Sequence, residues 1–162
     1  MIKYDNTQVV FSEVPDEVTL AINLTCCPHH CKGCHSSYLW EDYGDVLTEE
    51  SLQRLIDSNN GITCVAFMGG DNDVEALFEL NAFVHRAFPA LKTCWYTGFD
   101  YADDEFRMAS HRIFDFDYIK LGPYIEELGP LTSPTTNQVF LRKKTNNVFE
   151  NITKQFFKSE AR

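Results

Sequence analysis

The residues with the clearest chemical potential are four cysteines that fall within nine positions of one another. Cys26 and Cys27 come first, and Cys31 and Cys34 follow, so that the last three have the spacing C-x3-C-x2-C. In a chain of cytosolic type, such a tight cluster favours a metal site over a disulfide framework. Three thiolates on one short loop can hold three corners of a cubane [4Fe–4S] cluster, which leaves the fourth iron open to an outside ligand.

Zinc is the competing interpretation of the same residues. Structural zinc sites have four closed ligands, usually in paired C-x2-C units. His29, His30 or His35 could supply a fourth ligand beside the three cysteines, so the composition leaves both metals open. Buried cysteines without a metal are the least favoured interpretation, because the three lie at a metal-binding spacing beside Gly33.

The other cysteines are expected to be packed thiols. Cys64 and Cys94 fall inside predicted strands and are not grouped as a second ferredoxin-type cluster would require. Cys26 is adjacent to Cys27, and neighbouring side chains point in different directions, so a packed thiol is favoured there over a further ligand.

Apolar runs bounded by glycine, proline or polar turns predict the elements that position these residues. The predicted strands are 18–24, 63–68, 93–97, 118–121 and 138–142, and the predicted helices are 48–60, 73–88, 103–111 and about 145–160. Strands and helices alternate, which indicates an α/β fold with a mostly parallel sheet. We expect one domain over residues 1–162, with its core at about 18–142.

Ligands of parallel sheets bind at the carboxyl ends of the strands. Residues suited to binding follow each of the first four predicted strands, and their convergence predicts one site. In strand order these residues are the cysteine cluster, Gly69-Gly70-Asp71, Thr97-Gly98 and Gly122.

Composition argues against several classes of protein. The 24 acidic and 14 basic residues give a net charge of −10, which disfavours nucleic acid or an anionic membrane as the main partner, because phosphate binding requires a basic face. Residues 1–6 contain no apolar leader, and the longest apolar run, 64–68, is far shorter than the ~20 residues of a membrane helix. We therefore expect a cytoplasmic protein.

The motifs together resemble the radical S-adenosylmethionine (SAM) superfamily and, within it, the activating proteins of anaerobic ribonucleoside-triphosphate reductase. C-x3-C-x2-C is the superfamily's cysteine motif. The segments that narrow the resemblance are 24–35 with Trp40, 67–71 (FMGGD), 95–99 (WYTGF) and 122–138 (GPY to TTNQ). They span about residues 20 to 142 in the family's order. Departures are Cys26, where many relatives have glycine, Asn72, where proline is frequent, and His35-Ser36 after the third cysteine.

The resemblance implies a partial open (β/α) barrel of radical SAM type, since a complete eight-fold barrel of ~250 residues does not fit this chain. It implies that Cys27, Cys31 and Cys34 ligate a [4Fe–4S] cluster whose open iron binds SAM. It implies no catalytic residues beyond the cluster and SAM. Contacts to SAM are implied for Gly69, Gly70, Asp71, Asn72, Thr97, Gly98 and Asn137.

The implied reaction is reductive cleavage of SAM to a 5′-deoxyadenosyl radical, which takes a hydrogen atom from a glycine of the reductase's large subunit. A reduced flavodoxin- or ferredoxin-like protein would supply the electron. Two other functions stay open: another small radical SAM enzyme that acts on a small molecule, and a non-catalytic zinc or iron–sulfur binding module.

Ordinary structural roles are the alternatives for the single residues. The Gly69-Gly70 segment could be a plain strand-to-helix turn with Asp71 or Asn72 as its N-cap, and Asn137-Gln138 an exposed polar turn. His29 and His30 are expected to be exposed loop residues. Lys120 is either a paired lysine or a cation that lines a cavity, and the sequence leaves both open.

Overall fold

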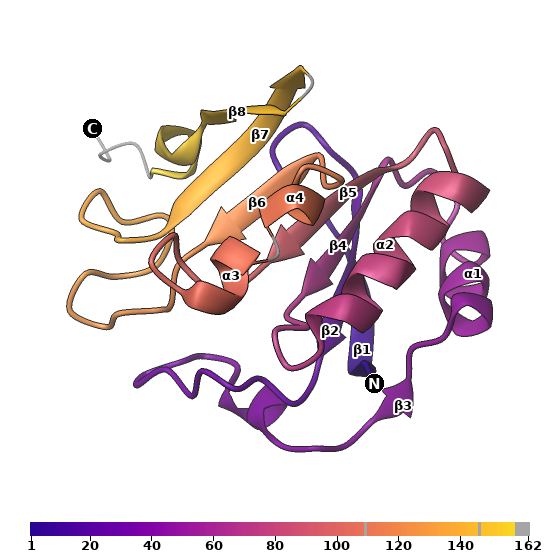
Figure 1. Ribbon diagram of the computed structural model, residues 1–162, viewed down its shortest axis with the longest axis horizontal. Helices are drawn as coiled ribbons and strands as arrows, with labels where there is room; N and C mark the ends of the chain where they lie inside the picture. The colour runs from indigo at the N-terminus through magenta and orange to yellow at the C-terminus, as the bar shows by residue number, and fades with distance from the viewer. Residues whose placement is uncertain (109, 146, 158–162) are drawn as a thin grey trace.

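One open sheet organises the molecule (Figure 1). The computed structural model describes residues 1–108, 110–145 and 147–157. The sheet has eight strands in the order β3-β1-β2-β4-β5-β6-β7-β8. The strands are β1 Lys3–Val10, β2 Thr19–Leu24, β3 Asp45–Val46, β4 Cys64–Met68, β5 Lys92–Tyr96, β6 Tyr118–Leu121, β7 Val139–Thr145 and β8 Val148–Asn151.

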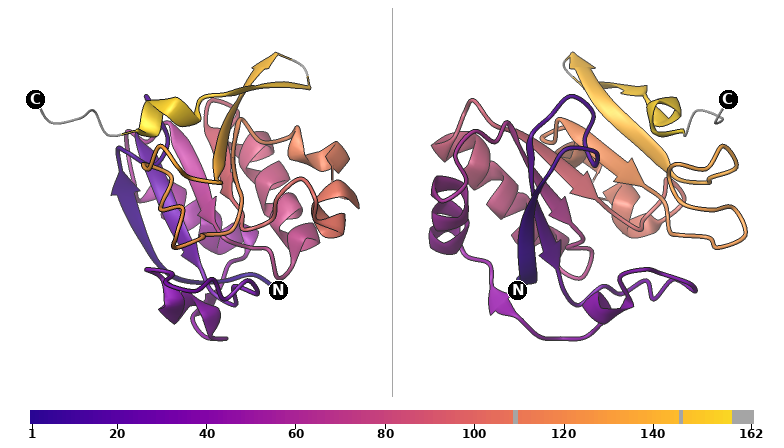
Figure 2. Two further views of the ribbon diagram at one scale, coloured as in Figure 1. Left: turned by 90° about the vertical axis from the view of Figure 1, so that its left-hand side faces the viewer. Right: turned by 180° about the vertical axis from the view of Figure 1, so that it is seen from behind.

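The helices pack on one face of this sheet, as Figures 1 and 2 show. They are α1 Glu49–Asp57, α2 Val74–Ala87, α3 Asp104–Met108 and α4 Ser110–Ile113, and the 3-10 turns are η1 Ser37–Trp40 and η2 Thr153–Phe156. The helix predicted over 103–111 is thus two short helices, with residue 109 outside the described residues. Within the described ranges, no helix has the length and apolar character needed to cross a membrane.

The sheet is mixed, and not mostly parallel as the sequence predicts. Strands β2, β4, β5 and β6 pair in parallel, whereas β1 with β2, β1 with β3, β6 with β7 and β7 with β8 pair antiparallel. The sequence analysis did not predict strand β1. This strand is mostly polar and half-exposed along its length, so it lacks the buried apolar run that would indicate a strand. The apolar runs predict the four strands of the parallel centre and also β7, at 138–142, which pairs antiparallel with β6. The partial-barrel shape stays a prediction.

Aromatic packing between the sheet and the helices holds the site's strand ends in place. Trp95 in β5 is fully buried, and its ring centroid lies 5.6 Å from those of both Phe78 and Phe116. Its indole Nε1 donates a hydrogen bond of 3.0 Å to the Gly69 carbonyl just after β4. The core therefore fixes the turn that follows β4.

The helix predicted at 145–160 is wrong over the described residues, which form the β7–β8 hairpin and the η2 turn; residues 158–160 lie outside them. Two residues separate the strands, and Asn147 has φ of +59°. Asparagine tolerates this left-handed conformation, which two-residue hairpins require. Phe149 then stacks on Phe114 at 5.5 Å, an apolar contact that the sequence pattern alone could equally assign to a helix.

Candidate metal centre

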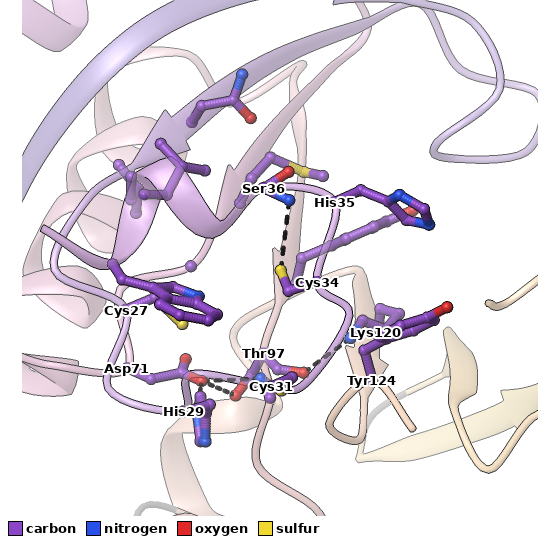
Figure 3. Close-up of a pocket in the computed structure, with 18 of the residues that line it drawn as sticks. Cys27, His29, Cys31, Cys34, His35, Ser36, Asp71, Thr97, Lys120 and Tyr124 are labelled. Atoms are coloured by element: carbon purple, nitrogen blue, oxygen red, sulfur yellow. Dashed lines mark hydrogen bonds and ion pairs between the residues drawn. The ribbon is translucent and has the colours of Figure 1, made fainter. Parts of the chain in front are cut away.

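The three spaced cysteines line one cavity of about 400 Å³ at the carboxyl ends of the parallel strands (Figure 3). The predicted convergence of strand-end residues is confirmed for Gly69, Asp71, Thr97 and Gly98, which line the same cavity. Gly70, Asn72, Gly122 and Asn137 lie outside its lining, so the predicted convergence does not extend to the residue after β6. Residues that the sequence analysis did not select also line it, among them Asn23, Leu39, Pro130 and Leu131.

Residues 26–36 form the cysteine loop, and backbone hydrogen bonds join its first residues to the segment that follows it. The amides of Cys26 and Cys27 donate to the carbonyls of Glu41 and Leu39, each at 3.1 Å. Within the loop, the Cys34 amide donates to the Cys31 carbonyl at 3.1 Å. The strand β2 and the 3-10 turn η1 thus flank the loop and hold its two ends, while its middle passes around the cavity (Figure 3).

The protein surroundings of the thiols suit sulfur ligands of a cluster. The Ser36 amide donates a hydrogen bond of 3.4 Å to Cys34 Sγ, and the backbone amides of His29 and His30 act to lower the pKa of the Cys27 thiol. Burial raises the pKa of the Cys27 thiol, and these amide bonds partly oppose that rise. A bound metal would favour the thiolate, which such amides stabilise.

The donor set fits a multinuclear cluster, in which each thiolate binds a different iron. Among the described residues, no three Cys, His, Asp or Glu side chains converge closely enough to hold a single metal ion. Cys27, Cys31 and Cys34 supply three sulfur ligands from one half-buried loop, and the cavity beside them has room for a further ligand. These residues would therefore hold a [4Fe–4S] cluster by three of its irons.

Asp71 joins the cysteine loop to two strand ends. Its side chain is 3% exposed, and its Oδ2 accepts hydrogen bonds from Thr97 Oγ1 and the Gly98 amide, both at 2.8 Å. His29 Nε2 lies 2.6 Å from the same oxygen. The other oxygen, Oδ1, is buried without a hydrogen-bond partner, so the carboxylate retains one acceptor that nothing in the described protein satisfies.

Lys120 is a buried cation on the cavity wall, which resolves the alternative left open by the sequence. It is 9% exposed, and its Nζ donates to the carbonyls of Thr97 at 3.1 Å and Gly122 at 2.9 Å. Loss of hydration on burial lowers its pKa to about 8, although Asp71 and the thiols of Cys31 and Cys27 act in the opposite direction. A lysine with this environment prefers an anionic neighbour.

The adjacent histidines His29 and His30 have different surroundings in the structure. His30 is exposed, as predicted, and stacks on Trp40 at 4.7 Å. The prediction that His29 is an exposed loop residue is wrong, because its side chain is only 19% exposed and bonded to Asp71. Its ring also meets Phe99 edge-on at 4.9 Å. Sequence offers no signal for this contact, since 42 positions separate the two bonded residues.

Cys26 does not line the cavity, and its Sγ lies 3.4 Å from Asp42 Oδ1 as a donor. Its backbone has φ of +63°, in the left-handed region that glycine adopts without cost. This explains structurally why glycine suits the position before the first cluster cysteine. The thiol is half-buried and hydrogen-bonded, in keeping with the packed role expected for it.

The stability of Cys26 variants should therefore depend on how well each new residue tolerates a positive φ. We expect Cys26→Gly to match or exceed the wild-type stability and Cys26→Val to lose roughly 1–2 kcal/mol, because a β-branched residue is strained at positive φ. Denaturant unfolding of the metal-free protein measures both. A Cys26→Val protein as stable as Cys26→Gly would contradict the assigned backbone conformation.

Comparison with known proteins finds one family. Residues 18–139 match the family model described as a 4Fe-4S single cluster domain. No curated protein and no solved structure matches the chain. The matched segment includes Cys27, Cys31 and Cys34 and the strand ends that form the cavity.

Proposed function

The chain belongs to the 4Fe-4S single cluster domain family, and from this premise we propose that it is a SAM-dependent activating enzyme of anaerobic ribonucleoside-triphosphate reductase. The family membership makes it an iron–sulfur protein with a cluster-binding domain. The proposal adds the second cofactor, SAM, and the radical SAM architecture in which the sheet is a partial open (β/α) barrel. With both cofactors bound, their chemistry would be reductive cleavage of SAM, followed by hydrogen abstraction from a glycine of the reductase.

One observation carries the proposal: a cavity of about 400 Å³ has three cysteines on one side and glycine-bearing strand ends on the other. That volume is within the usual range of small-molecule sites, ~300–1,000 Å³. Three cysteines leave one iron of a cubane without a protein ligand. The cavity thus offers both an iron position open to an outside ligand and the space for that ligand.

The polar groups of the wall match the ends of an amino-acid moiety. Lys120 would attract a carboxylate, since it is a buried cation. The unpartnered Asp71 Oδ1 would accept a hydrogen bond from an ammonium group. Gly69 and Gly98 allow backbone to approach a ligand closely. In this proposal no side chain acts as a general base, and the protein orients the ligands and excludes water.

The proposed partners are the large reductase subunit and a reduced flavodoxin- or ferredoxin-like electron donor. The net charge of −10 disfavours nucleic acid and an anionic membrane as partners and is compatible with a basic docking face on a protein. The glycine to be activated would enter the cavity from outside as part of a loop of the large subunit.

Radical transfer to that subunit tests the function. The reconstituted, reduced protein is incubated without oxygen with SAM and the purified large subunit, and the mixture is examined by electron paramagnetic resonance (EPR). We expect a glycyl-radical signal on the large subunit together with 5′-deoxyadenosine. A large subunit with its C-terminal radical glycine replaced by alanine serves as the control and should give no such signal.

The two alternatives predict different results. A radical SAM enzyme for a small molecule would form 5′-deoxyadenosine without a glycyl radical on the subunit. A binding module would form neither product, whether it holds zinc or a cluster. Either result would overturn the proposed activity while leaving the family membership unchanged.

A further inference from the structure

The cysteine loop has a contact to the sheet that no cofactor is needed to form. His29 stands between the first two spaced cysteines, and its Nε2 lies 2.6 Å from Asp71 Oδ2. The carboxylate is held in turn by the Thr97 hydroxyl and the Gly98 amide. The dashed lines in Figure 3 mark the contacts of Asp71 within this group.

The position after β5 is shaped to receive the His29 ring. A Cβ atom at Gly98 would lie 2.5 Å from His29 Cδ2 and 2.8 Å from Cγ, closer than real side chains approach. The φ of Gly98 is not positive, so the backbone does not require glycine there. The Phe99 ring also meets the histidine edge-on, at 4.9 Å between ring centroids. Space for His29 is thus the structural reason for glycine at position 98.

We propose that His29 is a positioning residue that locks the middle of the cysteine loop onto the ends of β4 and β5, so that Cys27 and Cys31 are presented before a cluster binds. The hydrogen bond to Asp71, the missing side chain at Gly98 and the ring of Phe99 fix the imidazole from three directions. The inference rests on the cysteines being cluster ligands, but not on SAM or on the reductase. His29 itself need not touch the cluster.

The expected effect of the His29 contacts is that the cysteine loop loses less conformational entropy when the cluster binds. The backbone of His30, next to the lock, has φ of +47°, a conformation that a free loop populates rarely. Metal sites on loops lose affinity when the groups that orient their ligands are removed, by about 10- to 100-fold. A loop released from Asp71 must be ordered by the cluster itself.

The experiment compares His29→Ala, His29→Gln and Gly98→Ala with the wild type. Glutamine places an amide nitrogen where Nε2 stood and retains a donor for Asp71. The Gly98→Ala substitution instead displaces the His29 ring without changing the amino-acid sequence of the loop. Cluster release from the reconstituted protein to an iron chelator is followed by absorbance. Amide hydrogen exchange of residues 27–34 is measured in the metal-free protein.

We expect iron release to be about tenfold faster or more in His29→Ala and in Gly98→Ala, and within about threefold of wild type in His29→Gln. Amide exchange of the loop should rise in the same two variants. In the double variant His29→Ala/Gly98→Ala, release should be no faster than in the single variants, because both changes remove one interaction. His30→Asn, which alters the exposed neighbouring histidine, is the matched control and should behave as wild type.

Other outcomes would overturn the inference. His29→Ala with wild-type exchange and iron release would show that the loop needs no such lock. Multiplicative effects in the double variant would show that position 98 and His29 act independently. Thermal melting of each variant identifies general unfolding, and loss of the rescue by glutamine would contradict the hydrogen bond. A wild-type protein that binds no iron would refute the cluster instead, and the exchange measurement would still decide the role of His29.

Discussion

Replacement of Cys27, Cys31 or Cys34 by alanine is expected to abolish the stable [4Fe–4S] cluster. Each of the three lines the cavity, and each would bind a separate iron. Loss of one sulfur ligand leaves a second iron without protein support. The expected result is a protein that fails to retain stoichiometric iron and sulfide after reconstitution and desalting. Iron and acid-labile sulfide analysis, with the visible absorbance of the cluster, measures it.

The adjacent cysteine supplies a close control. Cys26 is next to Cys27 but lies outside the cavity lining, with its thiol near Asp42. Cys26→Ala should therefore retain the iron and sulfide of the wild type. Retention of a full cluster by any one of the three ligand variants, or its loss in Cys26→Ala, would show that the wrong cysteines have been assigned.

Replacement of Lys120 by methionine is the second change with a large expected effect. Methionine has a similar length but no charge, so the cavity would lose its buried cation. Breaking a buried charge pair costs about 2–5 kcal/mol, which predicts SAM binding weaker by about 100-fold. Titration of the reconstituted protein with SAM, followed by EPR, measures this affinity. Iron content should not change, because among the described residues the hydrogen bonds of Lys120 go to the Thr97 and Gly122 carbonyls and not to the cysteines.

The same variant has a predicted pH dependence in the metal-free protein. The pKa of Lys120 is lowered from 10.5 to about 8 by burial, so the unfolded chain binds the proton more tightly than the folded one. The cost of the buried charge is fully present below pH 8 and disappears as the pH rises toward 10.5. The facing groups that oppose this shift are Asp71 after β4, Cys27 and Cys31 of the loop and Cys94 of β5.

The stability of the wild type relative to Lys120→Met should therefore rise by up to roughly 3 kcal/mol between neutral pH and pH ~10. Denaturant unfolding at several pH values measures the difference, in which the titrations of groups that do not interact with Lys120 cancel. The Cys94 thiol is not one of these groups, because the Lys120 charge acts to lower its pKa. Lys143→Met is the control, since Lys143 also donates to a backbone carbonyl but does not line this cavity. A flat difference for Lys120→Met, or unchanged SAM affinity, would show that the lysine is not the buried cation of the site.

The parallel centre of the sheet could be predicted because its strands are buried on both faces. The bounds predicted for β6 agree with the structure, and those for β4 differ by one residue. Strand β1 was not predicted from the sequence, because its residues are mostly polar and half-exposed. The helix prediction for the C-terminal segment failed because Phe149 and Ile152 fit one face of a helix as well as they fit a hairpin. The positive φ of Asn147 favours the hairpin.

The gathering of the candidate ligands at one cavity could be predicted, whereas the residues that support them could not. Cysteine spacing and strand-end glycines are local patterns, so the cavity's walls could be anticipated from residues near in sequence. The contact between His29 and Asp71 and the burial of Lys120 depend on how distant segments meet. The prediction that His29 is exposed failed for this reason, since a polar loop residue is buried only where tertiary structure supplies its partner.

The measurement that tests the central claim most directly is the EPR spectrum of the reduced, reconstituted protein before and after addition of SAM. The account predicts a [4Fe–4S] signal whose form changes with SAM, accompanied by 5′-deoxyadenosine and absent from the Cys27→Ala, Cys31→Ala and Cys34→Ala variants. A protein that holds zinc without iron or sulfide, or a cluster whose spectrum is the same with and without SAM, would contradict it.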